Sequence, residues 1–176
     1  MDTTLVSTFL NQIGLVAVKV PRFTQPSFID GVRIDGGKLF FDDTARASGL
    51  LHEAGHVAIT PGCYRHLLSG NLDSSFRKIF RLAECHHPES PISMALLQCS
   101  DVEATAWAYA AGMHLGMPPW QIIQDDEHDG DGPHIRLCLR LRSYLGVHGL
   151  HYAEMCHMKR YPEMDRWVQR DFQQSP

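Results

Sequence analysis

The chain of 176 residues has no long apolar run, no surplus of basic residues and no C-x-x-C pair of cysteines. No apolar stretch approaches the roughly 20 residues of a transmembrane helix, and the first residues lack the basic segment of a signal peptide. The formal net charge of −4 provides no positive excess to neutralise phosphates, which excludes a general nucleic-acid binder. We therefore expect a protein that acts without a membrane or a nucleic acid.

The cysteines also bear on location, because they form an odd set with no disulfide-framework spacing. Such a set favours a reducing compartment, so we expect a cytoplasmic protein. Hydrophobic residues make up 44% and charged residues 20% of the chain, a globular composition. The length is sufficient for one domain with a core, so residues 1–176 are expected to form a single domain. The five cysteines are Cys63, Cys85, Cys99, Cys138 and Cys156.

Local patterns indicate mixed secondary structure, with strands concentrated before residue 42. The β-prone runs on both sides of Asp35-Gly36-Gly37-Lys38 predict a hairpin. Asp42-Asp43-Thr44 is the expected cap of the helix that follows. This order predicts an α+β fold: a small, mostly antiparallel sheet packed on the 45–58 helix, followed by a largely helical C-terminal part. The expected elements are a helix over 5–13, a strand over 15–20, a hairpin of 32–34 and 39–41, helices over 45–58, in the second half of 64–81 and over 92–115 with a break near 100, and helices over 134–145 and 162–172.

The most informative motif is His52-Glu53-Ala54-Gly55-His56, which has the form H-E-x-x-H. On a helix, residues four apart lie within roughly 40° of each other, so His52 and His56 can reach one zinc ion. Glu53 lies on the adjoining edge of this face, where it is placed to take a proton from a zinc-bound water. Gly55 is small enough to let a neighbouring element pack close beside the metal. The motif therefore predicts a zinc site with a catalytic glutamate.

A catalytic zinc needs a third protein ligand. The metzincin pattern would require glycine at position 59 and histidine at position 62, but the chain has Ile59 and Gly62. That class is excluded, which leaves an acidic ligand from a later helix as the main option.

Glu103 is the preferred third ligand, because it lies on an alanine-rich helix where an acidic side chain is costly to bury unless it is paired or bound to metal. Asp101, two residues earlier, is a rival, and Glu84 is a weaker one. The pattern Ser100-x-x-Glu103 also fits a capping box, in which Glu103 would only satisfy a helix N-terminus.

The stretch from Thr44 to His56, the later Glu103-Ala104-x-x-Trp107-Ala108 and a Met117-Pro118 pair together resemble the ImmA/IrrE-type minimal gluzincins, over roughly residues 28 to 118. The resemblance implies a zincin-like core with Zn2+ held by His52, His56 and Glu103. It implies a zinc metallopeptidase in which Glu53 is catalytic and the substrate is a peptide or protein. It also permits a regulatory peptidase that cleaves one specific repressor, with a regulatory protein as partner.

The alternative is a zinc-stabilised interaction or regulatory module with little or no peptidase activity, whose closed site would take Cys85 or His86 as fourth ligand. For a peptidase, residues 39–41 resemble a zincin edge strand that could pair with an extended peptide. The acidic stretch 125–132 departs from the calcium-loop pattern, so a solvated loop is expected there. Candidates for stabilising the oxyanion, by residue type only, are His151, Tyr152 and Tyr144.

Overall fold

The computed structural model describes residues 3–25 and 29–172, and its first elements are a helix and a small sheet. Helix α1 (Thr3–Gln12) buries Val6, Phe9 and Leu10 and is followed by a turn with Gly14 at a φ of 88°. The strands are β1 (Ala17–Lys19), β2 (Val32–Asp35) and β3 (Lys38–Phe41). The helix, the first strand and the hairpin predicted from sequence are therefore confirmed.

The sheet is mixed, with the order β1-β3-β2. β3 pairs in parallel with β1 and antiparallel with β2, so the sheet is not mostly antiparallel as expected. The prediction that residues 39–41 form the edge strand is wrong, because the Leu39 N–H donates to the Val16 carbonyl at 2.8 Å and ties β3 to the β1 side. The edge strand beside the metal motif is β2.

Helix α2 (Ala47–Ile59) carries the H-E-x-x-H motif and packs against α1, β2 and β3. It begins later than predicted, since Arg46 is its N-cap residue and makes no capping hydrogen bond. Asp42 instead shapes the preceding turn, where its carboxylate accepts from the Thr44 and Phe23 N–H groups, each at 2.8 Å. The expected packing of the sheet on the motif helix is confirmed.

The rest of the chain is mainly helical, with the break near residue 100 where it was expected. Of the helix predicted over 134–145, residues 134–140 belong to α8 (Gly132–Arg140), which ends there. Helix α9 (Leu145–Tyr152) begins only at the last predicted residue, and no helix forms over 162–172. There the Gln169 N–H donates to the Ala58 carbonyl at 2.8 Å, and the Trp167 carbonyl accepts from Trp107 Nε1 at 2.8 Å. These bonds to other elements replace helical ones. The elements are α3 (Gly62–Arg65), α4 (Leu72–Ala83), α5 (Pro91–Leu96), α6 (Asp101–His114), α7 (Pro119–Ile122), the 3-10 turn η1 (His128–Gly130), α8 (Gly132–Arg140) and α9 (Leu145–Tyr152).

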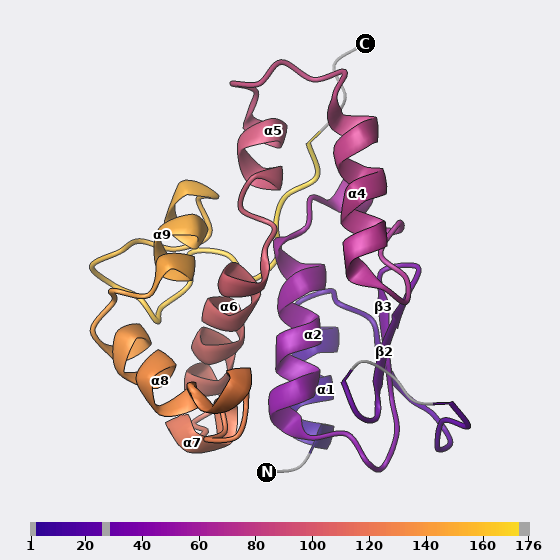
Figure 1. Ribbon diagram of the computed structural model, residues 1–176, viewed down its shortest axis with the longest axis vertical. Coiled ribbons are helices and arrows are strands. Elements are labelled where there is room, and N and C mark those ends of the chain that lie inside the picture. Colours follow the sequence, from indigo (N-terminus) through magenta and orange to yellow (C-terminus); the bar gives the residue numbers. More distant parts are fainter. Residues whose placement is uncertain (1–2, 26–28, 173–176) are drawn as a thin grey trace.

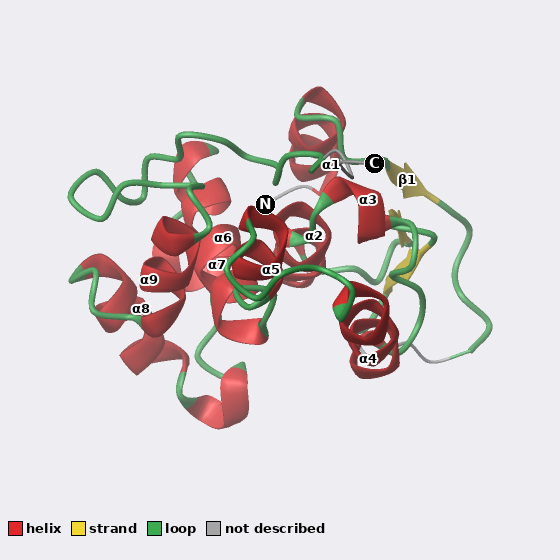
Figure 2. Cartoon of the chain, turned by 90° about the horizontal axis from the view of Figure 1, so that it is seen from above, coloured by secondary structure: helices red, strands yellow, loops and turns green. Residues whose placement is uncertain are grey.

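The core lies where α2 and α6 pack side by side. The sheet lies on one side of α2, while α8 and α9 lie beyond α6 on the other (Figure 1), and the view from above shows the same order (Figure 2). Trp107 on α6 and Tyr161 are among the largest fully buried side chains. Over the described ranges, no helix is long and apolar enough to cross a membrane. The architecture is thus an α+β fold with a helix pair at its centre.

Candidate metal centre

Helix α2 directs both histidines of the motif toward α6. The rings of His52 and His56 are 5.0 Å apart between centroids, in a T-shaped arrangement. His56 is buried, and His52 keeps 18% of its side chain exposed. The predicted helical geometry of the motif is therefore what the structure shows.

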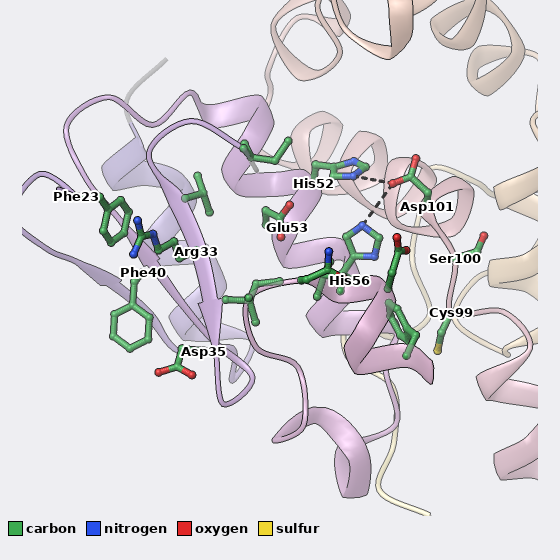
Figure 3. A pocket seen from close by; sticks show the side chains of 18 of the residues that line it. Phe23, Arg33, Asp35, Phe40, His52, Glu53, His56, Cys99, Ser100 and Asp101 are labelled. Carbon is green, nitrogen blue, oxygen red and sulfur yellow. Dashed lines mark hydrogen bonds and ion pairs between the residues drawn. The ribbon is translucent and has the colours of Figure 1, made fainter. Parts of the chain in front are cut away.

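The first turn of α6 supplies a carboxylate to this pair (Figure 3). Asp101 Oδ1 lies 3.1 Å from His52 Nε2 and 3.5 Å from His56 Nε2. One ligand atom from each of the three residues lies within 4.8 Å of the other two, so this group could hold a metal ion. We call these three residues, His52, His56 and Asp101, the candidate metal-binding group, or the metal-binding group for short. Among the described residues it is the one such group of three or more His, Cys, Asp or Glu side chains.

A close approach of the two helices makes this arrangement possible. A Cβ placed on Gly55 would lie 2.5 Å from the backbone oxygen of Ala104 and 3.0 Å from its Cα. Glycine at this position therefore allows the α6 backbone to lie directly against α2, one turn from the metal-binding side chains. The small residue in the motif has the packing role predicted for it.

Glu103 lies outside the metal-binding group, contrary to expectation. Its carboxylate accepts a hydrogen bond from the Ser100 hydroxyl, and a Cβ on Gly149 of α9 would lie 2.0 Å from Glu103 Oε1. Burial raises the pKa of Glu103 overall, against the opposing effect of hydrogen bonds with the Ser100 hydroxyl and with the backbone of Glu103 and Ser100. Glu103 thus occupies the capping position that the Ser100-x-x-Glu103 pattern offered as the alternative, and it faces α9.

The charges of the group depend on one another. Hydrogen bonds from His52 and His56 hold the pKa of Asp101 well below its usual range. Burial tends to lower the pKa of His52, but the hydrogen bond and charge of Asp101, with the charges of Glu53 and Glu127, raise it overall. Without a metal ion, the contacts of Asp101 with His52 and His56 hold the group together.

The remote ring nitrogens of the histidines have different surroundings. His52 Nδ1 lies 3.5 Å from the Thr105 hydroxyl on α6. His56 Nδ1 is buried and has no hydrogen-bond partner among the described residues. Sequence reasoning missed Thr105, although its position four residues after Asp101 places it one turn along the same face of α6.

Tyr144 is the one candidate for oxyanion stabilisation that lies near this group. Burial raises the pKa of its phenol, a hydrogen bond with Thr105 opposes the rise, and the charges of Asp101 and Glu103 add to it. His151 instead lies with Nδ1 3.2 Å from the Cys156 carbonyl, and Tyr152 is 67% exposed.

The two candidates for a fourth ligand also lie elsewhere. His86 Nε2 is 2.8 Å from the Tyr64 hydroxyl, and the exposed Cys85 thiol donates to the Leu82 carbonyl at 3.2 Å. Neither residue belongs to the metal-binding group, nor does Glu84.

The acidic loop after α7 brings a residue that sequence analysis did not single out. His128 has a φ of 54°, and its ring lies 6.0 Å from that of His52 between centroids. Carboxylates of the same loop pair with arginines, Asp126 with Arg46 and Asp125 with Arg136. The loop therefore covers one side of the metal-binding group.

A cleft of about 1010 Å³ opens onto the other side of the group. Its walls are β2 with the loop before it, the start of α4 and the segment 99–101 (Figure 3). Glu53 is 8% exposed and lines this cleft between β2 and the segment 99–101 (Figure 3). Burial raises its pKa, against the opposing charges of His56 and His52. Phe76 on α4 lies 6.2 Å from the His56 ring between centroids and narrows the cleft beside the group.

Comparison of the chain with protein-family models, with curated proteins and with solved structures finds no match. The resemblance to minimal gluzincins therefore stays a prediction, and the functional argument rests on the site itself.

Proposed function

We propose that this protein is a zinc-dependent peptidase, with His52, His56 and Asp101 as ligands and Glu53 as general base. The observation that carries the proposal is the meeting of three potential ligand atoms within 4.8 Å, beside a buried glutamate in the wall of a cleft. Asp101 takes the role first expected of Glu103, because it is the carboxylate that faces the histidines.

The distances from Asp101 Oδ1 to the two histidine nitrogens fit a zinc ion. Ligands held about 2.0–2.1 Å from a tetrahedral zinc are separated from each other by about 3.3 Å. The two distances from Asp101 Oδ1 to the histidine Nε2 atoms, 3.1 and 3.5 Å, bracket this value. Two imidazoles and one carboxylate are also a donor set that catalytic zinc sites use, with one position left open.

Zinc bound here would act as a Lewis acid on a substrate carbonyl and lower the pKa of water. The chain supplies the proton transfers. The Glu53 carboxylate takes a proton from the attacking water and then delivers it to the nitrogen of the broken peptide bond. Its burial and its raised pKa suit a group that must both accept and release a proton.

The cleft also offers a backbone edge to an extended peptide. The Ile34 carbonyl of β2 accepts from the Gly70 N–H at 2.9 Å, so the backbone groups of Ile34 point away from β3. Alternation along the strand directs those of Val32 the same way. On this edge the Val32 N–H already donates to the Ile29 carbonyl at 3.1 Å, which leaves the Val32 carbonyl and the Ile34 N–H as the groups that a peptide substrate could pair with. This is the role that the sequence assigned to residues 39–41.

The variant Glu53→Gln tests the proposal against the alternative of a purely structural metal site. We expect it to keep one zinc per chain by elemental analysis and to cleave unstructured peptides at least about a hundredfold more slowly, because general-base catalysis contributes about 10²–10⁴-fold. Full cleavage by this variant would refute the general-base role, and a wild-type protein that binds zinc without cleaving any peptide would favour the structural alternative.

The matched pair Asp101→Ala and Glu103→Ala tests the third ligand. Loss of a residue that binds zinc directly should weaken zinc binding by more than roughly 10–100-fold, which is the usual effect of removing a hydrogen-bond partner of a ligand. We expect this loss for Asp101→Ala, whereas Glu103→Ala should lower stability with little change in zinc affinity. The reverse result would restore Glu103 as the ligand.

A further inference from the structure

The cleft contains a positively charged side chain at the end opposite Asp101. Arg33 lies on β2, and its guanidinium stands over the Phe23 ring at 4.4 Å from the centroid. Its Nη2 donates to the Gln25 carbonyl. Figure 3 shows the Arg33–Phe23 pair on the far side of Glu53 from Asp101. The arginine is thus held in place on the wall of the same cleft as the metal-binding group.

Arg33 has no carboxylate partner among the described residues, and of the residues that line the cleft it is the one Lys or Arg. Asp35, two positions along β2, is exposed and accepts from the Ser69 hydroxyl at 3.0 Å. Asp73 on α4 is also exposed. Glu53 and Asp101 lie at the metal-binding end, where a cation would balance them. The charge of Arg33 therefore lacks an acidic partner in the part of the chain that the structure describes.

The surroundings of Arg33 strengthen its attraction for an anion. The side chain is half-buried, with the aromatic ring of Phe23 below it and Phe40 opposite it on β3. Partial removal from water reduces the screening of its charge. The contacts with Phe23 and Gln25 already fix its rotamer, so binding a ligand costs little further side-chain entropy. A guanidinium keeps several donors for a carboxylate in this position.

We propose that Arg33 binds a carboxylate of the substrate, so that the cleft selects acidic peptides. The inference rests on the proposed peptidase function and names its substrate class. The carboxylate would belong to a residue away from the bond that is cleaved, because Arg33 lies beyond Glu53 from the metal-binding group. An Asp or Glu side chain and a free C-terminus offer the same chemistry.

The test measures binding rather than cleavage. Labelled peptides are titrated into the zinc-loaded Glu53→Gln protein, and affinity is read from fluorescence anisotropy. Each peptide that contains Glu is paired with one that has Gln at the same position, with the position moved along the sequence. Each is also made with a free and an amidated C-terminus, which separates side-chain from terminal recognition.

At one position, or at the C-terminus, we expect the carboxylate peptide to bind about tenfold more tightly than its neutral partner, the effect of one charge-assisted pair. Arg33→Gln in the same background should remove this preference, Arg33→Lys should keep part of it, and Arg33→Glu should shift it toward Lys-containing peptides. The control Lys38→Gln changes a cation of the same sheet that does not line the cleft, and should leave the preference intact.

Equal affinity within every pair, a preference for Lys-containing peptides, or no binding at all would overturn the inference. Failure of the proposed function is distinguishable. If the Glu53→Gln protein discriminates between the peptides but the wild-type protein cleaves none of them, Arg33 still defines an acidic-peptide site and the peptidase activity is refuted.

Discussion

The contact between Gly55 and Ala104 controls whether α6 can bring Asp101 to the histidines, and Gly55→Ala perturbs it. The added Cβ would lie 2.5 Å from the Ala104 backbone oxygen, while ordinary contact begins at 3.4 Å. The atom that it meets is backbone and cannot rotate away. The α6 backbone must therefore move by about 0.9 Å at this point.

Two energies oppose each other in this variant. Alanine in a helix interior is favoured over glycine by about 1 kcal/mol, and overpacking of a core costs about 1–3 kcal/mol. We expect the metal-free protein to lose up to about 2 kcal/mol of its free energy of unfolding. The effect on the metal should be larger, because ligand distances must hold within about 0.2 Å.

Zinc affinity should accordingly fall by at least about tenfold, which removes about 1.4 kcal/mol of the stabilisation that saturating zinc provides. Thermal unfolding by circular dichroism, with chelator and with zinc, separates the two effects, and chelator competition gives the affinity. Gly112→Ala is the matched control on α6, since the three atoms nearest to its Cβ belong to the buried Ile122 side chain, at the end of the helix far from Asp101. A Gly55→Ala protein with a raised melting temperature and unchanged zinc affinity would refute the role of this contact.

Two further predictions concern the histidines. Thr105→Val removes the hydroxyl 3.5 Å from His52 Nδ1 and should weaken zinc binding about 10–100-fold. Thr105→Ser should restore the affinity. An unchanged affinity in the valine variant would show that the hydroxyl does not orient the ring. In the metal-free protein the pKa of His52 is raised above its ordinary 6.5, so the stability from its pair with Asp101 is complete below pH 6.5 and is lost as the pH rises through the raised pKa. Zinc needs neutral imidazoles, so the melting-temperature increase caused by zinc should grow over the same pH range. An increase that shrinks as the pH rises would contradict the assignment. Asp101→Asn should remove the fall of melting temperature with rising pH in the metal-free protein.

Local geometry made one part of the site predictable. The spacing of His52 and His56 follows from the turn of a single helix, and the apolar pattern around them places that helix in the core. The hairpin of β2 and β3 is equally local, because its turn sequence lies between its strands. The position of β1 is not local. It pairs with β3 through residues more than 20 positions away. The sequence pattern therefore predicts β3 as an edge strand, whereas β3 is the central strand of the sheet.

The choice between Asp101 and Glu103 shows what the chain alone does not determine. Residues two apart on a helix point about 200° away from each other, so Asp101 and Glu103 cannot both face α2. Which of them does depends on how α6 is rotated, and that rotation is fixed by packing against Gly55 on one side and Gly149 on the other.

Burial was the reason for preferring Glu103, since a buried acid must be compensated. The structure offsets part of that cost through hydrogen bonds with Ser100 and with the backbone at the start of the helix. Asp101 needs no such compensation, because 65% of its side chain is exposed. A carboxylate at the surface of the helix pair can meet an ion and a substrate that both arrive from the cleft, whereas one enclosed against α9 cannot. The more exposed of two neighbouring acids is therefore the better candidate for an open metal site.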